Sequence, residues 1–528
     1  MKLVDILSDN FNREDWEEKG YILPKFDIKA VREKTYSRPS WVHFGAGNIF
    51  RALPTAMLQK LLDDGIYDRG IIAAESYASI DDTYKAFDNL SILVTLCADG
   101  SLKKKVLASV TEALKADYTD ADDWNRLVEI FENRSLQLIS FTITEKGYAV
   151  PPDDLSNGLK PEAIVGKVAA LLYKRFEAGA YPVALQSMDN CARNGDVLRN
   201  AVITYAKAWE NAGLAQKAFL DYLSDENRVA FPWSMVDKIT PYPDENVRKK
   251  LVDTGLKDCE IIVTDKGTHT GCFVNAEEAE YLVVEDKYPA GKIPLDKAGV
   301  IFTDRETVEK VEKMKVGACL NPLHTALAIF GCLLGYTRIS DEMKDRDLAE
   351  LVTRMSHLES LPVVRHPGII DPKAFMDEAI NKRLPNPFLP DTPQRIATDT
   401  SQKIPVRFGG TIKAYNEQGL DLSNLHYIPL VLAGYARYLK AVDDEGKPFT
   451  LSPDPLLSEL TPIVSGLVVG GKNQDMSVLR QLYTRADIFG VDLYSVGLGE
   501  KIEKLAAKLY SGVGAVRETI AECLKSGE

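Results

Sequence analysis

The chain has 528 residues, of which 45% are hydrophobic and 27% charged, and its formal net charge is -13. It is too long for one ordinary hydrophobic core, so we expect two large domains. The acidic balance argues against a nucleic-acid partner, because phosphate contacts require a surplus of Lys and Arg. No run approaches the roughly 18 consecutive apolar residues of a membrane span, so we expect no membrane partner.

The cysteines and the first residues of the chain bear on its compartment. Seven cysteines are scattered without CxxC spacing, which is typical of a reducing compartment and predicts no zinc site. The start, MKLVDILSDNFNRED, is acidic and lacks the apolar core of a signal peptide. We therefore expect a cytoplasmic protein that uses no metal. No heptad pattern indicates a large assembly, so a monomer or small homo-oligomer is expected.

Strands and helices alternate in the first half of the sequence. A polar lead-in is followed by SWVHFGAGNIFRALPTAMLQKLLDDG, which indicates a buried strand, a glycine turn and an amphipathic helix. GIIAAES indicates a second buried strand, ending in an acid. Further apolar runs are ILVTLC, LQLISFTIT, PVALQSM and EIIVT. The alternation predicts an α/β domain with a mainly parallel sheet.

Long helical patterns dominate from about Val308 onward, for example LHTALAIFGCLLGY and YIPLVLAGYARYLKAV. The turn-rich segment YPAGKIPLDKAG precedes this change. We therefore predict a Rossmann-like dinucleotide-binding domain with an N-terminal extension over residues 1–304. A mostly α-helical domain for the substrate and the catalytic groups would occupy residues 305–528.

The glycine turn after the first strand carries the cofactor signal. Gly45 would make the tight turn, and Gly47 would let the backbone approach a pyrophosphate that sits on the following helix N-terminus, beside Asn48. The third glycine of the usual fingerprint is replaced by Phe50. Arg51, one turn into the helix, either adds a phosphate contact or faces solvent.

Glu75 ends the second strand, where a carboxylate can accept hydrogen bonds from the ribose hydroxyls and repel a 2′-phosphate. It follows the glycines at a greater distance than the usual twenty or so residues. On the functional interpretation NAD is favoured over NADP. The alternative is a solvated acid at a strand end.

Asn321 and His324 belong to the segment KVGACLNPLH, and their spacing puts both side chains on one helix face. The surrounding residues are apolar, so these polar groups are either buried with partners or line a site. The pattern alone leaves a hydrogen-bonded core pair and a catalytic pair open.

Motifs along most of the chain, taken in order, resemble those of one enzyme family. They are GAGNIFRA, SFTITEKGY, SMDNCARNGDVLR, FPWSMVDKITP, VVEDKYPAGKIPLDKAGV, NPLHTALA and DTPQRIATDTSQKIP. Together they resemble the polyol-specific long-chain dehydrogenases, the mannitol dehydrogenase family, which also contains fructuronate and tagaturonate reductases.

The resemblance implies a role for several residues. The family's general base corresponds to Lys315, its oxyanion-binding pair to Asn190 and Asn321, and its substrate-orienting histidine to His324. The other matches are substrate contacts at Arg395, Lys403 and Asp237, and cofactor-loop residues at Thr144 and Glu145. Four of these residues have a structural alternative. Arg395 could instead satisfy helix-end carbonyls, and Lys403 could be a solvated loop charge. Asp237 could be a structural hydrogen-bond acceptor, and Glu145 could belong to an ion pair.

These residue types suit hydride transfer. Oxidation of an alcohol needs a base, and a lysine supplies one when desolvation disfavours its ammonium form. Two asparagine amides can hold the developing alkoxide, each such donor being worth on the order of 3 kcal/mol.

The sequence departs from the family pattern at two places. The lysine precedes Asn321 by six residues where the family has five, so either a bulge near Gly317 absorbs one residue or another group, such as Lys313, is the base. The second departure is Trp233, where many relatives carry Asn.

We expect an NAD-dependent oxidoreductase that reduces fructuronate toward mannonate. A mannitol-type or tagaturonate-type dehydrogenase is the alternative among enzymes. A catalytically silent NAD-binding sensor is the alternative from another class.

Overall fold

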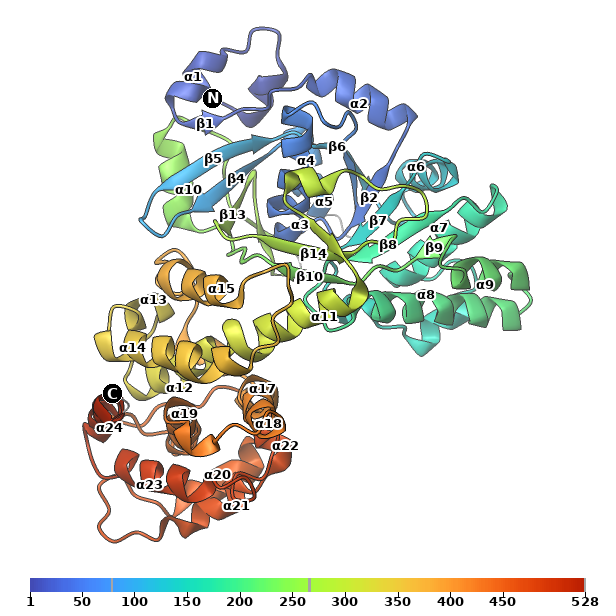
Figure 1. The fold of residues 1–528 in the computed structure, drawn as a ribbon. Helices are drawn as coiled ribbons and strands as arrows, with labels where there is room; N and C mark the ends of the chain where they lie inside the picture. Colours follow the sequence, from blue (N-terminus) through green and yellow to red (C-terminus); the bar gives the residue numbers. More distant parts are fainter. Residues whose placement is uncertain (77–78, 265–266, 527–528) are drawn as a thin grey trace. The chain divides into compact units, whose positions relative to one another are not determined.

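The computed structural model describes residues 1–76, 79–264 and 267–526 (Figure 1). The chain divides into two compact units. Unit 1 comprises Met1–Cys97 and Ser101–Glu309, and unit 2 comprises Ala98–Gly100 and Lys310–Glu528. The predicted domain boundary, between residues 304 and 305, directly precedes α11 (Arg305–Met314), and the division between the units falls within α11, after Glu309.

A six-stranded sheet, parallel throughout, forms the centre of unit 1. Its strands, in spatial order, are β6 (Val110–Lys115), β3 (Ile71–Glu75), β2 (Trp41–Phe44), β7 (Leu138–Phe141), β8 (Val183–Ser187) and β9 (Val229–Ala230). This is the strand order of two joined βαβαβ halves. The order reverses between β2 and β7, and ligands of such sheets bind outside the carboxyl ends of the strands at that point.

Helices bury both faces of the sheet. One core joins it to α6 (Ala121–Glu132), α7 (Ile164–Glu177) and α8 (Asn194–Asn211) through residues such as Ile130, Leu171 and Val202. The other core joins it to α4 (Pro54–Asp63) through Leu58 and Leu61. Because both faces are covered, the strands read as continuous apolar runs rather than as alternating ones.

Smaller sheets surround the main one, and here the sequence-based prediction was partly wrong. The run ILVTLC forms β4 (Ser91–Leu96), which pairs with the antiparallel β5 (Leu102–Leu107) in a separate four-stranded sheet. A connection this short can only make a hairpin, which forces the antiparallel direction. The run EIIVT contributes only β11 (Ile262–Val263), in a two-stranded ribbon.

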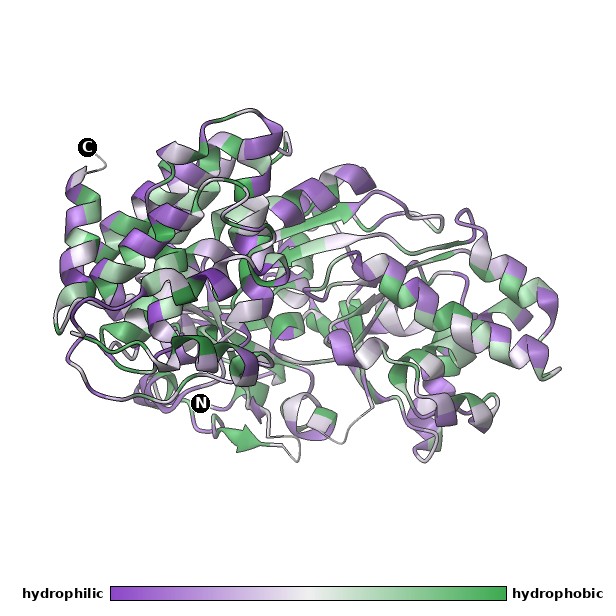
Figure 2. Ribbon diagram, turned by 90° about the horizontal axis from the view of Figure 1, so that it is seen from below, coloured by the Kyte–Doolittle hydropathy of each residue, from purple (hydrophilic) through white to green (hydrophobic). Residues whose placement is uncertain are grey.

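Unit 2 is built from helices around one large core. The main ones are α12 (Asn321–Leu333), α14 (Arg346–Arg354), α19 (Tyr427–Tyr438), α23 (Gly499–Leu509) and α24 (Ala515–Ser526). Every residue of α19 is buried. Most helices carry both apolar and polar residues along their length (Figure 2). The mostly helical character predicted for this part of the chain is confirmed.

A continuous helical run from Arg305 to Leu333 is long and apolar enough to cross a membrane by length and composition alone. However, 78% of its most apolar window is buried inside the protein. Burial against other helices accounts for this hydropathy, as in the core helix of a globular domain.

Candidate active site

A cavity of about 660 Å³ opens in unit 1 and is lined by the glycine turn, by Glu75 and by the loop after β7. Many of its residues lie at or just beyond the carboxyl ends of β2, β3 and β7, which is the side on which parallel sheets of this type bind ligands. The volume is in the range of ordinary small-molecule sites.

Glycine suits the two positions of the turn for different structural reasons. Gly45 has φ +93°, and a Cβ there would lie 2.2 Å from the carbonyl oxygen of Thr142. Gly47 caps α3 (Asn48–Ala52), and a Cβ there would meet nothing within 4 Å, so its backbone is open to the cavity. Asn48, the first residue of α3, also lines the cavity. The geometry allows the close backbone approach that a pyrophosphate requires.

Phe50 and Arg51, in α3, are fully buried, and neither is among the described residues that line the cavity. The Phe50 ring stacks on His43 of β2 with centroids 4.1 Å apart, in place of the close helix–strand contact that a third glycine would give. Arg51 donates to the carbonyl oxygen of Gly271 at 2.6 Å and to Thr270 Oγ1 at 3.2 Å. Neither alternative considered for Arg51, a phosphate contact or a solvated charge, describes this core position.

Glu75 lines the cavity and lies next to the glycine turn. Its Oε2 accepts from the backbone N–H of Ala46 at 3.2 Å, and its Oε1 accepts from the N–H of Ser76 at 3.0 Å. The long interval from the glycines contains both α3 and α4, which are separated at Leu53. A carboxylate at this place suits the ribose hydroxyls of a dinucleotide.

The loop after β7 is fixed by a buried acid that sequence reasoning missed. Asp189 Oδ2 accepts from the N–H of Ile143 at 2.9 Å and from the hydroxyl of Tyr148 at 2.6 Å, and its Oδ1 accepts from the N–H of Thr144 at 2.9 Å. Thr144 lines the cavity, but Glu145 is exposed and, among the described residues, is not part of the wall. The SMDN motif itself was the available signal for Asp189.

Asn190 is exposed in the connection between β8 and α8, next to this buried acid. The buried Asn194 braces the connection: its amide nitrogen donates to the carbonyl oxygens of Asp189 and Ser234, both at 3.0 Å. Its amide oxygen accepts from the N–H of Ser234 at 3.0 Å. The motif therefore contains two structural polar residues beside the exposed amide.

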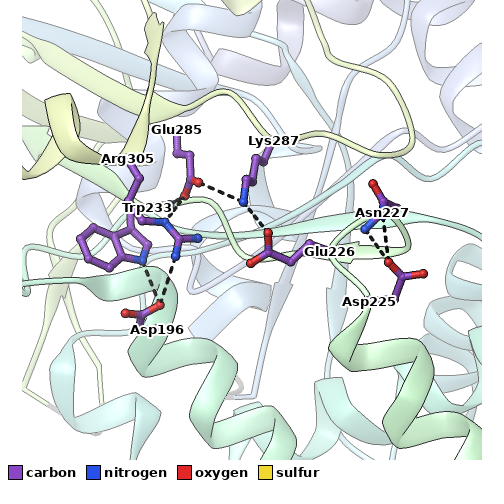
Figure 3. A network of polar contacts seen from close by, with 8 residues as sticks. All are labelled: Asp196, Asp225, Glu226, Asn227, Trp233, Glu285, Lys287 and Arg305. Atoms are coloured by element: carbon purple, nitrogen blue, oxygen red, sulfur yellow. Dashed lines mark hydrogen bonds and ion pairs between the residues drawn. The ribbon is translucent and has the colours of Figure 1, made fainter.

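Trp233, one of the two departures from the family pattern, sits in a polar network within unit 1 (Figure 3). Its indole Nε1 donates to Asp196 at 3.0 Å, and its backbone N–H donates to Glu285 at 3.2 Å. Arg305 donates to the same Glu285 at 3.0 Å and lies over the indole ring, 5.0 Å from its centroid. The network joins the start of α8 to the segment that leads into β10 (Ser234–Asp237). Asp237, at the end of β10, is buried.

Lys315 begins a π turn, η6 (Lys315–Cys319), that directly precedes α12. The side chain of Lys315 is buried, with 3% of its surface exposed. The interval from Lys315 to Asn321 is one residue longer than in the family. The π turn accommodates this extra residue, because a π turn holds one residue more than an α turn. Asn321 and His324 follow on the first turn of α12.

His324 is enclosed in unit 2, and its Nε2 lies 3.7 Å from Asp391 Oδ2. Desolvation lowers the pKa of His324 to about 4, although the Asp391 carboxylate opposes this shift. Arg383, Arg395 and Arg407 add to the lowering. The imidazole is therefore neutral at neutral pH. Asp391, which sequence reasoning missed, is the first residue of the DTPQRIATDTSQKIP motif.

Arg395 and Lys403 lie in the same region but have protein partners. Arg395 forms an ion pair with Asp391. Lys403 donates to the carbonyl oxygen of Ile396 at 3.1 Å and to that of Thr398. Thus Lys403, rather than Arg395, satisfies the carbonyls at a helix end.

The comparisons with known proteins cover nearly the whole chain. The family model described as "Mannitol dehydrogenase Rossmann domain" matches residues 39–297, and "Mannitol dehydrogenase C-terminal domain" matches residues 307–497. The chain belongs to the mannitol dehydrogenase family.

Its relatives include a D-mannonate oxidoreductase of Thermotoga maritima, which is 52% identical over 97% of both chains. The solved mannitol 2-dehydrogenase of Pseudomonas fluorescens, in a complex with NAD and D-mannitol, is 26% identical with a TM-score of 0.70. That comparison covers 99% of this chain and 100% of the other. A solved D-sorbitol dehydrogenase is 25% identical with a TM-score of 0.78, covering 94% of this chain and 97% of the other.

The predictions of family, fold, enzyme class and NAD as cofactor are confirmed. The roles of individual residues stay predictions. Gly45, Gly47, Asn48, Glu75 and Thr144 lie around one cavity in unit 1, whereas Lys315, Asn321, His324, Arg395 and Lys403 lie in unit 2.

Proposed function

We propose that the chain catalyses the NAD(H)-dependent interconversion of D-fructuronate and D-mannonate in the cytoplasm. The observation that carries this proposal is the 52% identity, over 97% of both chains, to a D-mannonate oxidoreductase. The proposed reaction uses a nicotinamide dinucleotide as its cofactor, and we expect it to use no metal. No nucleic-acid or membrane partner is proposed, and the protein is expected to be a monomer or a small homo-oligomer.

The residues around the unit 1 cavity fit the dinucleotide. Gly45 and Gly47 would hold the pyrophosphate, Glu75 the adenosine ribose, and Thr144 the loop side of the cofactor. When bound, the nicotinamide ring supplies or accepts the hydride. Glu75 would disfavour a 2′-phosphate through like-charge repulsion, which favours NAD.

Proton transfer is proposed for Lys315. In reduction its ammonium gives a proton to the ketone oxygen, and in oxidation the neutral amine takes the hydroxyl proton. The buried position of Lys315 is the kind of environment in which a lysine amine becomes available as a base. Asn190 and Asn321 would donate to the reacting oxygen and stabilise its developing charge.

His324 is proposed to orient the substrate rather than to transfer the proton. Its pKa of about 4 keeps the imidazole neutral, so it can accept or donate a hydrogen bond to a substrate hydroxyl. Arg395 and Lys403 would contribute positive charge near the substrate, and Asp237 would contribute a buried acceptor.

A substrate panel tests this function. Purified protein is mixed with NADH and, in separate wells, D-fructuronate, D-tagaturonate or D-fructose, and the loss of NADH absorbance is followed. Rapid oxidation with D-fructuronate alone supports the proposal. A preference for D-tagaturonate or D-fructose would reassign the substrate within the family. Silence with every substrate, with NADH still bound, would favour a sensor.

A further inference from the structure

Cationic side chains gather around His324 in unit 2, although the chain as a whole is acidic. Arg383, Arg395 and Arg407 all act on His324 by their positive charge, and only Asp391 opposes them. Desolvation is the largest cause of a lowered pKa at Lys403. The charges of Arg407 and Arg395 lower this pKa further, and those of Asp399 and Asp454 raise it. This local excess of positive charge suits an anionic ligand.

Two of these cations are already engaged. Asp391 neutralises Arg395, most of whose side chain is exposed. Lys403 is turned onto the carbonyl oxygens of Ile396 and Thr398. Neither arrangement leaves the full set of donors for a substrate carboxylate.

Arg407 differs from both. It is the last residue of α17 (Thr400–Arg407), which packs against η6, and its side chain is half-buried. Its Nη1 donates to Thr325 Oγ1 at 2.6 Å and to the carbonyl oxygen of Asn321 at 3.3 Å. Within residues 1–76, 79–264 and 267–526, no carboxylate lies within 4 Å of the guanidinium, and Nε and Nη2 have no hydrogen-bond partner.

A guanidinium charge in this environment is costly when no anion accompanies it. Burial alone lowers the pKa of Arg407 to about 10, and no neighbouring acid raises it. Nε and Nη2 form one edge of the planar guanidinium, and such an edge matches the two oxygens of a carboxylate. The contacts of Nη1 hold the plane in place and leave that edge available.

We propose that Arg407 binds the carboxylate of the sugar-acid substrate and thereby selects sugar acids over neutral polyols. The inference rests on the proposed fructuronate activity and adds the residue that distinguishes this substrate class. Arg407 contacts α12 at Asn321, whose amide is proposed to hold the reacting oxygen. Helix α12 would thus fix the distance between the two ends of the substrate.

The test measures dissociation constants by calorimetry with NADH already bound, so that D-mannonate and D-mannitol bind without reacting. Arg407→Gln removes the charge and the paired donors, while its amide can still contact Thr325. We expect it to weaken D-mannonate binding at least about tenfold, because charge-assisted hydrogen bonds are lost. Binding of D-mannitol should change less than about threefold. Arg407→Lys, which keeps the charge without the paired edge, should fall between wild type and Arg407→Gln for D-mannonate.

Arg365→Gln is the matched control, because Arg365 is 83% exposed and its nearest carboxylate, on Glu417, is 3.9 Å away. It should leave both constants unchanged. Equal weakening of D-mannonate and D-mannitol by Arg407→Gln would overturn the inference, because Arg407 would then act only by positioning Asn321. If wild type reduces D-fructuronate and Arg407→Gln binds D-mannonate as tightly as wild type does, the inference about Arg407 is overturned while the proposed function stands. A wild type inactive on D-fructuronate would overturn the proposed function and this inference with it.

Discussion

The backbone N–H of Leu320 donates to the carbonyl oxygen of Lys315 at 3.1 Å, which closes a π turn immediately before α12. The turn takes up one residue more than an α turn would. The six-residue interval between Lys315 and Asn321 can therefore serve the same geometry as the five-residue interval of the family. The unusual spacing no longer argues against Lys315 as the base.

Lys315→Ala should lower turnover by about 10²–10⁴-fold, the usual contribution of a positioned acid or base. NADH should still bind, because the cofactor cavity lies in unit 1. Stopped-flow turnover and NADH fluorescence titration measure the two properties. Lys313→Ala is the control, since Lys313 is the other nearby lysine. If Lys313→Ala lost the activity and Lys315→Ala kept it, the base would be misassigned.

Glu75→Ala should relax the preference for NAD, because it removes the carboxylate that accepts from ribose hydroxyls and repels a 2′-phosphate. The ratio of kcat/KM for NADH to that for NADPH should fall about tenfold or more, which corresponds to roughly 1.4 kcal/mol. An unchanged ratio would remove Glu75 from the cofactor site.

Asp189→Ala should weaken NADH binding. It leaves the N–H groups of Ile143 and Thr144 without their acceptor and removes one of the two hydrogen-bond partners of the Tyr148 hydroxyl. Each lost acceptor for a buried donor costs about 1–3 kcal/mol, and the loop that these donors belong to lines the cofactor cavity. Fluorescence titration gives the NADH affinity, with the exposed Asp153→Ala as control. Equal affinities for both variants would contradict this role.

Glu342→Gln should change how stability depends on pH. Glu342 is fully buried against Gly331, and neither carboxylate oxygen has a hydrogen-bond partner among the described residues. Burial, assisted by the charge of Asp345, raises its pKa well above 4.5. The folded protein therefore keeps a proton that the unfolded chain releases as pH rises above 4.5, so wild-type stability falls with pH through the raised pKa.

The measurement is the Tm of wild type and Glu342→Gln from pH 5 to pH 8. The wild-type Tm should decline relative to that of the variant, which has no carboxyl group at this position to titrate. The exposed Glu417→Gln should follow the wild type. Parallel curves for wild type and Glu342→Gln would contradict a raised pKa of the Glu342 carboxyl in the folded protein.

Local patterns in the sequence predicted most of the fold. The turn at Gly45 and Gly47 and the strand that ends at Glu75 follow from glycine conformation and from buried apolar runs. Strand β6 was missed because VTEALK is an edge strand with mixed polarity, which gives a weak signal. The place of β4 outside the main sheet depends on its hairpin with the lysine-rich β5, which apolar runs do not reveal.

The site was harder to predict, because the roles of charged residues depend on distant partners. Arg51 is buried by Thr270 and Gly271, more than 200 positions along the chain. Arg407 is distinguished by the absence of a carboxylate among the described residues around it, which no motif can show. Spacing alone left Asn321 and His324 open as either a core pair or a catalytic pair. The resemblance to the family supplied their proposed roles, and it alone indicated Lys315.

The most direct test of the account runs the reaction in the oxidative direction. Purified protein is given NAD and D-mannonate, and NADH formation is followed at 340 nm alongside an equal concentration of D-mannitol. We predict rapid NADH formation with D-mannonate and a rate at least about a hundredfold lower with D-mannitol. D-mannitol has no carboxylate and so cannot make the paired, charge-assisted hydrogen bonds proposed for Arg407. NADH formation with D-mannitol and none with D-mannonate would contradict the proposed substrate.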